Sequence, residues 1–353
     1  MGAEHPTRAY GAAIIGNCLG EGGQLVRSFR LHPRVKIVAG YEPSQPRGEE
    51  LAHAIGRPLA ESADIILNDP GVDIVAVACE PRDKAEFVRM AAAARKHILL
   101  IPPMCDSLQA ARSMVAAVAA NNVKLVQDQP LIRFNAPFAR LLADAGGEPL
   151  GKVLSYYHNF GLNFAREFNI ALKWPELLMP AEKMGGGELT QLGSQALDFA
   201  IALLGRPLRV QARWHHDWPA YQRAGVENAG QVILDYGGFF GVLTVGRQQL
   251  EGGFKHSQCM HVVAESKTLF IDGTNGLIFR NNAPITREQY MRGFEVETAL
   301  DQLVRCIAED ATPASSVEVA ADGMEALMAV YRSILDDRPV DLPLGDGANP
   351  LQK

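Results

Sequence analysis

The strongest constraint on the fold is the alternation, across residues 12–127, of short apolar runs with longer alanine-rich amphipathic segments. The short runs are too apolar to expose one face to water, so each predicts a strand buried on both faces. The amphipathic segments predict helices that cover the resulting parallel sheet, which makes this half a doubly wound α/β domain. The predicted strands are Ala12–Ile15, Val35–Ala39, Ile74–Ala78, Ile98–Ile101 and Val123–Val126, and the clearest helices are Asp83–Arg95 and Ser107–Ala120.

Past Gly151 the pattern changes to longer runs in which apolar and polar residues alternate, as expected for strands with one exposed face. Tyr236-Gly237-Gly238 predicts a hairpin turn between two of these runs, because glycine adopts positive φ without strain. We therefore expect an α+β domain with an open, mostly antiparallel sheet and one helix after Gly185-Gly186-Gly187. The predicted strands are Lys152–Phe160, Leu208–Trp214, Gly230–Asp235, Phe239–Val245, His256–Ala264 and Thr268–Ile271, and the closing helices are Val296–Glu309 and Val317–Leu335.

A length of 353 residues exceeds what one compact core supports, so we expect two domains, residues 1–130 and 131–353. The closing helices can pack back on the first of them. The net charge of −6 and the lack of a basic stripe in the sequence argue against a nucleic-acid partner. No apolar run reaches the roughly 18 residues that span a bilayer, and residues 1–10 lack a secretory pattern. These features predict a cytoplasmic protein with no membrane partner.

The sequence predicts no metal site. Its cysteines stand singly, without the paired spacing of a zinc site or the pattern of a disulfide framework. His215 and His216 are adjacent, so on a strand they point to opposite faces and cannot readily share one ion. The cysteines are Cys18, Cys79, Cys105, Cys259 and Cys306.

The first predicted strand runs into a glycine-rich turn and then a helix, which is where a dinucleotide fingerprint lies. Glycines there allow a tight turn and let backbone N–H groups approach the pyrophosphate at a helix N-terminus. The spacing is imperfect, because Cys18 stands at the second glycine position and Glu21 at the third, and a plain glycine-rich turn remains the alternative. The residues predicted to hold the cofactor here are Gly16, Asn17, Cys18, Leu19 and Gly20.

The second predicted strand ends near Glu42, about where a ribose-binding carboxylate is expected, roughly 20 residues beyond the glycines. A carboxylate there accepts from ribose hydroxyls and repels a 2′-phosphate, so we expect NAD in preference to NADP, although Arg47 lies nearby. The alternative for Glu42 is a solvated turn carboxylate. Because ligands of open α/β sheets sit beyond the carboxyl ends of the strands, further residues there are assigned to the cofactor. They are Cys79, Glu80, Pro81, Pro102 and Gln129.

Several motifs together resemble one family along nearly the whole chain. The segment identified as similar runs from Ala12 to about Pro343, and the chain resembles the glucose–fructose oxidoreductase, inositol dehydrogenase and MocA family. The resemblance implies a Rossmann domain followed by an α/β domain with an open antiparallel sheet. It also implies oxidation or reduction of a secondary alcohol or ketone on a sugar or polyol, and dimers or tetramers formed through the open sheet. The motifs are Asp69-Pro70-Gly71-Val72-Asp73, Lys96-His97-Ile98-Leu99-Leu100, Arg133-Phe134, Gly185-Gly186-Gly187 and Arg338-Pro339-Val340-Asp341-Leu342-Pro343.

The chain departs from this family at the residues that move the substrate proton. Pro102 stands where the resemblance implies a lysine, and Gln191 and Gln195 stand where it implies an aspartate and a histidine, while Asp198 is retained. Positions 191, 195 and 198 share one face of a helix. The amides offer hydrogen bonds but exchange no proton near neutrality, and a structural role for Asp198 is the favoured alternative to a catalytic one.

Other groups can replace this relay. His158 is a natural proton acceptor by its ordinary pKa, and Lys183 becomes one if it is desolvated. The alternatives are that His158 is a packed or surface residue and that Lys183 is a solvated loop residue. Strand alternation places Tyr156 and His158 on one face and Tyr157 on the other. Asp128 and Lys173 are further candidates, and we expect the ligand cleft to be lined by Pro102, Gln191, Gln195 and His158 or Tyr157.

These observations leave two functions open. The first is an NAD(P)-dependent oxidoreductase of a carbohydrate-like or cyclic hydroxy or keto compound, with a non-standard proton relay. The second is a non-redox descendant, either a sensor of dinucleotide or sugar or an NAD-using enzyme without net redox turnover. The intact cofactor frame favours the first, and the replaced lysine, aspartate and histidine favour the second.

Overall fold

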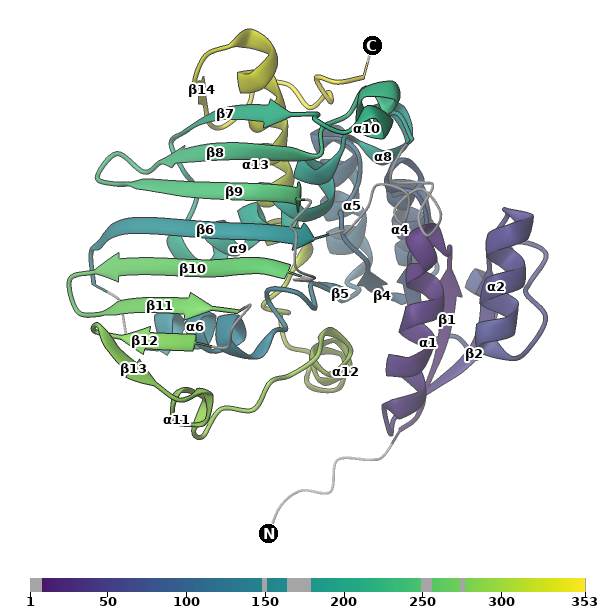
Figure 1. The fold of residues 1–353 in the computed structure, drawn as a ribbon. Coiled ribbons are helices and arrows are strands. Elements are labelled where there is room, and N and C mark those ends of the chain that lie inside the picture. The colour runs from purple at the N-terminus through teal and green to yellow at the C-terminus, as the bar shows by residue number, and fades with distance from the viewer. Residues whose placement is uncertain (1–7, 148–150, 164–178, 249–255, 274–276, 353) are drawn as a thin grey trace. The chain divides into compact units, whose positions relative to one another are not determined.

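The computed structural model describes residues 8–147, 151–163, 179–248, 256–273 and 277–352 (Figure 1). These residues form two compact units, each assembled from separate stretches of the chain. The first unit contains residues 1–101, 113–128 and 298–317, and the second contains residues 102–112, 129–297 and 318–353.

The first unit is built on a five-stranded sheet in which every pair of neighbours is parallel. This confirms the predicted doubly wound domain. The strand order is β2-β1-β3-β4-β5, so the direction in which the chain winds reverses between β1 and β3. The strands are β1 (Tyr10–Ile15), β2 (Val35–Tyr41), β3 (Ile74–Val77), β4 (His97–Leu100) and β5 (Leu125–Gln127).

Helices on this sheet come from the expected crossovers and from one late segment of the chain. Helix α4 packs on β3 and β4, α1 and α2 pack beside β2, and α12 packs on β4 and β5. The capping box of Thr298, with Asp301 at its third position, begins α12 later than the apolar pattern predicted. The helices are α1 (Glu21–Leu31), α2 (Gln45–Ile55), α3 (Ala63–Asn68), α4 (Pro81–Ala93) and α12 (Ala299–Glu309), while α5 (Leu108–Asn121) crosses the division at residue 112.

The second unit is built on a nine-stranded sheet of order β13-β12-β11-β10-β6-β9-β8-β7-β14. Only the β6–β9 pair is parallel, so the prediction of a mostly antiparallel sheet is confirmed. Its strands are β6 (Val153–Asn163), β7 (Arg209–His215), β8 (Ala229–Asp235), β9 (Phe240–Gln248), β10 (His256–Ala264), β11 (Thr268–Asp272), β12 (Leu277–Arg280), β13 (Ala283–Ile285) and β14 (Val340–Asp341).

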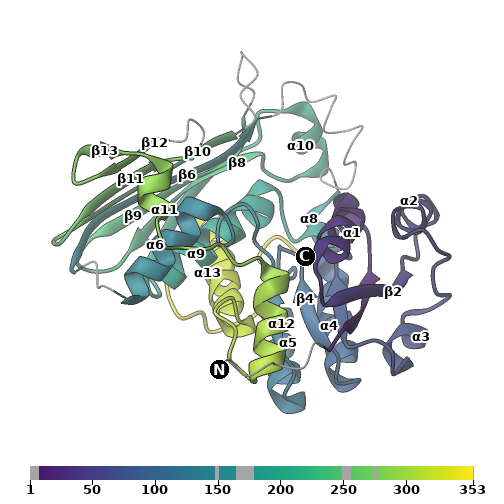
Figure 2. The ribbon, with the colours of Figure 1, turned by 90° about the horizontal axis from the view of Figure 1, so that it is seen from below.

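One face of this sheet is covered by helices α6, α9 and α13, and no described helix lies along the other (Figure 2). The alternation along β6 follows from this arrangement, because Tyr156, His158 and Phe160 are buried while Tyr157 is 38% exposed. The predicted hairpin turn is also confirmed, since Gly237 has φ of 79° between β8 and β9. The helices of this unit are α6 (Ala136–Gly147), α8 (Ala181–Met184), α9 (Ser194–Leu204), α10 (Pro219–Ala224), α11 (Arg287–Met291) and α13 (Val317–Asp336).

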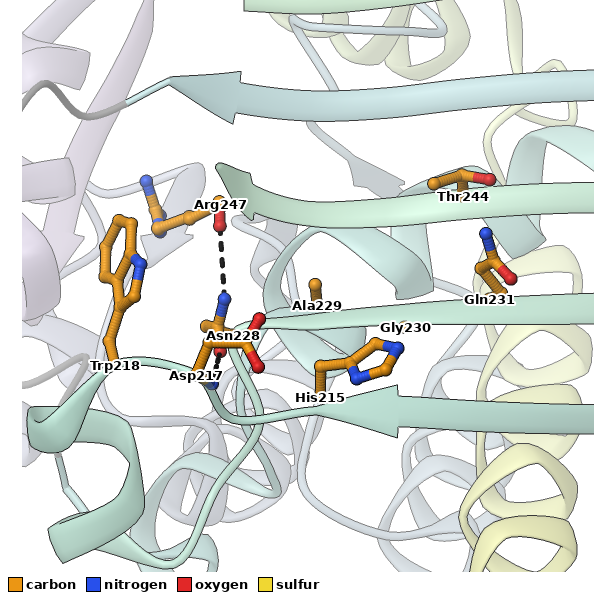
Figure 3. A pocket seen from close by; sticks show the side chains of 9 residues that line it. All are labelled: His215, Asp217, Trp218, Asn228, Ala229, Gly230, Gln231, Thr244 and Arg247. Carbon is orange, nitrogen blue, oxygen red and sulfur yellow. Dashed lines mark hydrogen bonds between the residues drawn. The ribbon is translucent and has the colours of Figure 1, made fainter. Parts of the chain in front are cut away.

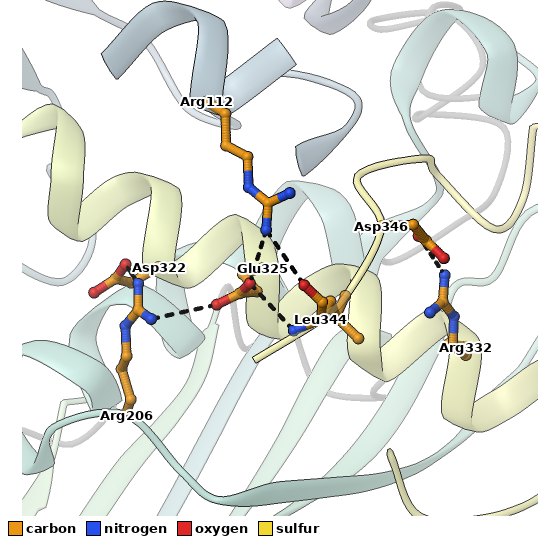
Figure 4. Close-up of polar contacts among 7 residues, drawn as sticks. All are labelled: Arg112, Arg206, Asp322, Glu325, Arg332, Leu344 and Asp346. Carbon is orange, nitrogen blue, oxygen red and sulfur yellow. Dashed lines mark hydrogen bonds and ion pairs between the residues drawn. The ribbon is translucent and has the colours of Figure 1, made fainter. Parts of the chain in front are cut away.

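The C-terminal segment is fastened to α13 by a polar cluster (Figure 4). The carboxylate of Glu325 accepts hydrogen bonds from the Leu344 backbone N–H and from Arg112, both at 3.3 Å. Arg206 approaches the same carboxylate at 3.4 Å. Glu325 is buried, so this charge-assisted network holds the chain beyond β14 more firmly than an exposed ion pair would.

Candidate functional site

The glycine turn after β1 is held between the ends of β2 and β3. The Gly16 N–H donates to the Tyr41 carbonyl at 2.8 Å, and the Cys18 N–H donates to the Ala78 carbonyl at 2.9 Å. The turn therefore lies beside the point where strand order reverses, between β1 and β3. That point is where open α/β sheets bind their ligands.

Close packing between this turn and α1 identifies the glycines that the fold requires. A Cβ at Gly22 would lie 2.3 Å from the Gly16 carbonyl oxygen, and one at Gly16, whose φ is 92°, would lie 2.3 Å from the Cys79 nitrogen. Gly22, rather than the residue at position 21, thus allows the close helix–strand packing that the third fingerprint glycine provides. The turn is one residue longer than the standard spacing, which explains the displaced glycines.

The turn also suits a diphosphate. Helix α1 begins at Glu21, and Gly20 before it offers no side-chain cap. The Gly23 N–H of the first turn donates to the Asn17 side-chain oxygen at 2.9 Å, and the Glu21 N–H donates to the Cys18 carbonyl, so a ligand would meet the other N–H groups of this turn. The N–H groups of a first helical turn have no acceptor within the helix and lie at the positive end of its dipole. An anion therefore fits there, and the turn leading to it would hold the dinucleotide. Gly20 has φ of 72°, so glycine suits that turn position.

Glu42 lies at the end of β2 and is bound more closely by the protein than the sequence suggested. Its carboxylate accepts from the backbone N–H groups of Asn17 at 2.7 Å and Ser44 at 2.8 Å. Arg47 donates to Glu42 and to Glu80, each at 3.1 Å. This clamp ties the glycine turn to the ends of β2 and β3. Two carboxylates share the charge of Arg47, which disfavours its use for a 2′-phosphate.

Cys79 and Pro81 follow β3 and were both assigned to the cofactor from the sequence. Burial raises the pKa of the Cys79 thiol to about 12, so it is neutral and unreactive at physiological pH. Pro81 begins α4, a position where its missing N–H has no cost. Both follow the strand next to the glycine turn, and their cofactor role stays a prediction.

In the second unit, Glu227 fixes the start of the helix that carries the two glutamines. Its buried carboxylate accepts from the N–H groups of Gly187 at 3.1 Å and Leu189 at 2.9 Å, and from the Tyr331 hydroxyl at 2.8 Å. Burial raises the pKa of Glu227 to about 7, while these donors oppose the shift. A Cβ at Gly187 would lie 2.0 Å from the Glu227 carbonyl oxygen, so only glycine fits.

The helix opens with a π-helical turn, Leu189–Gly193, before α9. Such turns are rare and frequent at functional sites. Gln191 lies within it, and the Gln195 amide nitrogen donates to the Gln191 carbonyl at 2.9 Å. The Gln191 side-chain nitrogen and the Gln195 side-chain oxygen are both buried with no hydrogen-bond partner among the described residues.

Gln129 also has a side-chain amide without hydrogen-bond partners. This residue is fully buried, and neither its amide nitrogen nor its amide oxygen has a partner within the described part of the chain. The turn that follows it is fastened to α9, because Arg133 forms a buried ion pair with Asp198. Buried polar groups are rarely left unsatisfied. The Gln129, Gln191 and Gln195 amides are therefore strong candidates for ligand contacts.

The Arg133 pair also decides how Asp198 is interpreted. Both partners are buried, and Arg133 additionally donates to the Asp198 backbone carbonyl at 3.5 Å. A carboxylate engaged in this way orients the helix and the Gln129 turn. The geometry supports the structural role that the sequence favoured, and we treat Asp198 as a positioning residue.

His158 lies in an apolar core instead of a solvated site. Phe138, Phe160 and Phe199 surround its ring, and its residue is fully buried. Its Nδ1 lies 3.3 Å from the Tyr156 hydroxyl. Burial lowers the pKa of His158 to about 3, so the ring stays neutral at physiological pH. This environment indicates a packing role, and we do not carry His158 into the proposed site.

Four further residues were named from the sequence as candidates for the site. Pro102 is buried and follows Ile101 at the end of β4. Lys183 is partly exposed on α8 (Ala181–Met184). Lys173 lies outside the described residues. Burial raises the pKa of Asp128, which follows β5, to about 6.

A pocket of about 380 Å³ opens in the second unit on the face of the sheet that lacks helices (Figure 3). His215, Trp218 and Gln231 line it, together with Asn228 and Arg247. Arg247 pairs with Glu188, which immediately precedes the π-helical turn. The pocket is therefore linked to the Gln191 segment through one buried ion pair, a connection that the sequence did not reveal.

Two features are absent from the described residues. They contain no group of three or more histidine, cysteine, aspartate and glutamate side chains placed to hold a metal ion. None of the helices in the described ranges is long and apolar enough to cross a membrane.

Comparisons with known proteins agree with this geometry. Residues 10–129 match the model of an oxidoreductase family with an NAD-binding Rossmann fold, and residues 144–278 match the C-terminal domain of the same family. The chain thus belongs to the class of NAD-binding oxidoreductases. Within that class it is a member of the glucose–fructose oxidoreductase, inositol dehydrogenase and MocA family. No curated protein sequence matches it significantly.

Solved structures share the fold at low sequence identity. Aldose–aldose oxidoreductase from Caulobacter crescentus, complexed with glycerol, has a TM-score of 0.77 and 22% identity, covering 95% of this chain and 100% of that one. The WlbA dehydrogenase from Bordetella pertussis, in complex with NADH and UDP-GlcNAcA, has a TM-score of 0.77 and 18% identity. The match covers 96% of this chain and 98% of that one. An oxidoreductase from Agrobacterium radiobacter, in complex with NAD+, L-tartaric acid and magnesium, has a TM-score of 0.76 and 18% identity. The match covers 94% of this chain and 98% of that one.

The packing of α1 can be tested with two adjacent glycines. Gly22→Ala should lower the free energy of unfolding by about 2 kcal/mol, because the added methyl overlaps the Gly16 carbonyl. Gly23→Ala is the matched control, since its Cβ would meet only ordinary contacts beyond 3.6 Å. It should stabilise the protein by about 0.5–1 kcal/mol. Urea denaturation measures both, and equal stability of the two variants would contradict the revised fingerprint.

Proposed function

We propose that the protein is an NAD-dependent oxidoreductase of a carbohydrate-like or cyclic hydroxy or keto compound, with uncharged amides where proton-transferring residues are expected. The observation that carries this proposal is the set of buried, unpartnered amide atoms of Gln129, Gln191 and Gln195 in the second unit. An amide both donates and accepts, which matches the hydroxyl and carbonyl groups of such a compound. A purely apolar ligand would leave these atoms unsatisfied.

The first unit would hold the cofactor. The glycine turn and the first helical turn of α1 would bind the diphosphate, and Glu42 at the end of β2 would lie toward the adenosine ribose. NAD supplies hydride chemistry when bound. Because Glu42 and Glu80 neutralise Arg47, we expect NAD to bind more tightly than NADP.

The substrate class is also supported by what related folds bind. The Bordetella pertussis structure contains a sugar nucleotide, and the Caulobacter crescentus enzyme is named for its action on aldoses. These properties belong to those proteins. They agree with a hydroxyl-rich ligand for the Gln129, Gln191 and Gln195 amides of this chain.

One observation favours the alternative of a protein without net redox turnover. Neither Gln191 nor Gln195 can accept a proton, and burial lowers the pKa of His158 to about 3, which makes it a weak proton acceptor near neutrality. A general acid or base typically raises the rate by a factor of about 100 to 10,000. In this protein another group would have to supply that proton transfer. A protein that keeps NAD(H) bound and releases no NADH with any substrate would fit this alternative.

Substitution of Gln195 tests the proposed substrate contact. Gln195→Ala should lower kcat/KM about tenfold or more, because it removes a buried hydrogen-bonding group. The dissociation constant of NAD should change by about twofold or less, since an uncharged contact to the substrate is lost and none to the diphosphate. NADH formation over a panel of sugars, polyols and lactones measures the first, and calorimetry the second.

The control for this experiment is Gln222→Ala, which removes an exposed amide on α10. It should behave as the wild type does. An unchanged kcat/KM in Gln195→Ala would contradict the proposal. A wild type that carries NAD(H) but reduces or oxidises nothing in the panel would favour the alternative.

We further propose that copies of the chain associate through the open face of the nine-stranded sheet. A cross-strand row on that face joins β8, β9, β6, β10, β11 and β12 by direct register partners. Ile233 is 41% exposed and Tyr157 is 38% exposed within it. Contiguous apolar surface of this kind marks interaction sites. The row consists of Ile233, Val242, Tyr157, His261, Phe270 and Phe279.

The double variant Ile233→Asp/Tyr157→Asp should therefore shift the protein toward the monomer, because two charges would be buried in the association surface. Light scattering coupled to size exclusion measures the mass. Leu31→Asp is the control, since this residue of α1 is 73% exposed outside the row. A monomeric wild type, or an unchanged oligomer in the double variant, would refute the proposed surface.

A further inference from the structure

We propose that Asn349 is a positioning residue for the glutamine site, by which we mean the amides of Gln129, Gln191 and Gln195. Its buried side chain joins two segments of the second unit that are continuous in sequence with site positions. The effect on turnover rests on the proposed function, whereas the joining of the two segments does not. Asn349 itself touches neither the cofactor site nor the glutamines described above.

The two segments meet at Gly185. The first, residues 102–107, follows β4 and begins at Pro102, where the family resemblance implies a lysine. The second, residues 185–188, leads directly into the π-helical turn that carries Gln191. A Cβ at Gly185, whose φ is 81°, would lie 3.0 Å from the Asp106 Cα, so the two backbones are in close contact.

Asn349 bridges these segments with one side-chain amide. Its Nδ2 donates to the Asp106 carbonyl at 2.7 Å and to the Gly185 carbonyl at 2.8 Å. Its Oδ1 accepts from the Leu351 N–H at 2.9 Å, and the residue is 3% exposed. Both donor hydrogens are therefore spent on the backbones of the two segments. Alanine or a carboxylate at this position supplies no such pair of donors.

Neighbouring residues hold the bridge in place from the side of the first segment. The Gln352 side-chain nitrogen donates to the Asp106 carboxylate at 2.9 Å and to the Ala181 carbonyl at 3.4 Å. The Gly347 carbonyl accepts from the Gln109 N–H at 2.8 Å. Residues 347–352 thus lie along the start of α5 as well as against the second segment.

An apolar contact holds the bridge from the side of the second segment. Leu351 packs against the cluster of Ala181, Tyr221 and Val226. The Tyr221 hydroxyl donates to Glu188 at 2.6 Å, and Glu188 immediately precedes the π-helical turn. Asn349 is therefore the polar centre of a packed region that reaches the turn from two directions.

The consequence for the site follows from the cost of losing the bridge. Removal of the Asn349 amide takes their donor from two buried carbonyls, which loosens the contact at Gly185. A displacement of about 1 Å at a reacting group can lower the rate about a hundredfold. Asn349 thus acts on the reaction through the backbone, by holding the segments that begin at Pro102 and end at the π-helical turn.

Hydrogen–deuterium exchange of the full chain tests the bridge without a substrate. Asn349→Ala should raise exchange about fivefold or more in residues 103–111 and in residues 185–192 together, because one substitution releases both segments. The reporters are the N–H groups of Gln109, Gly185 and Gln191, which donate to the carbonyls of Gly347, Ala181 and Gly187.

Turnover tests the positioning role. On the best substrate of the sugar, polyol and lactone panel, Asn349→Ala should lower kcat/KM about tenfold to a hundredfold. The dissociation constant of NAD should change by about twofold or less, because the diphosphate site belongs to the first unit.

A second variant adds a readout that a loss of stability alone would not give. Asn349→Asp keeps the shape, and its carboxylate donates nothing, but a protonated carboxyl donates once. Burial raises the pKa of a carboxyl group. The activity of this variant relative to the wild type should therefore rise as the pH falls from about 8 to about 6, whereas that of Asn349→Ala should not.

The matched control is Asp346→Ala. It removes an ion pair of 2.7 Å with Arg332 that fastens the same stretch of chain outside the bridge (Figure 4). Exchange in both segments and kcat/KM should stay as in the wild type.

Three results would overturn the inference: exchange in Asn349→Ala that rises only within residues 344–352, an equal rise of both segments in Asp346→Ala, or an unchanged kcat/KM in Asn349→Ala. Exchange is measured in both Asn349 variants, so failure of one of them to fold leaves the test intact. A wild type that turns over nothing in the panel would contradict the proposed function, while the exchange measurement would still decide whether Asn349 joins the two segments.

Discussion

The contact between Gly22 on α1 and the carbonyl of Gly16 is the constraint on which the cofactor site depends. It brings the helix against the end of β1 more closely than any side chain at Gly22 allows. The approach directs the first turn of α1 at the edge of the sheet where strand order reverses. One packing requirement therefore determines where the diphosphate would bind.

The second unit depends on a comparable close contact, between Gly187 and the backbone of Glu227. Here Glu227, buried and bound by two backbone N–H groups, sets the start of the π-helical turn that carries Gln191. Glu188 then links this turn through Arg247 to the pocket on the open face of the sheet. Two buried carboxylates, Glu188 directly after the three glycines and Glu227 bound to the Gly187 N–H, thus position glutamines that carry no charge of their own.

Much of the architecture follows from periodicity alone. Every strand of the first sheet and the first six strands of the second could be predicted, because their apolar patterns record which faces are buried. Strands β12, β13 and β14 escaped prediction, since β12 and β13 are short and largely exposed and β14 has two residues. The π-helical turn was equally invisible, because an inserted residue leaves no mark in an apolar pattern.

The site was predicted less well, for physical reasons that differ between residues. The family resemblance pointed to Gln191 and Gln195, but only the structure shows their unpartnered atoms. His158 is a proton acceptor by residue type, whereas burial among aromatic rings lowers its pKa to about 3 and makes it a weak acceptor near neutrality. Asn349 carries no sequence signal, since an asparagine before a proline normally lies in a turn, and its burial is a product of tertiary packing.

A crystal structure of the protein grown with NAD tests the cofactor site most directly. We expect the diphosphate to lie on the N–H groups of the first turn of α1, with Gly22 against the Gly16 carbonyl and the adenosine ribose toward Glu42. A diphosphate bound elsewhere on the first unit, or a helix α1 displaced from the glycine turn, would contradict the revised fingerprint and the cofactor site built on it.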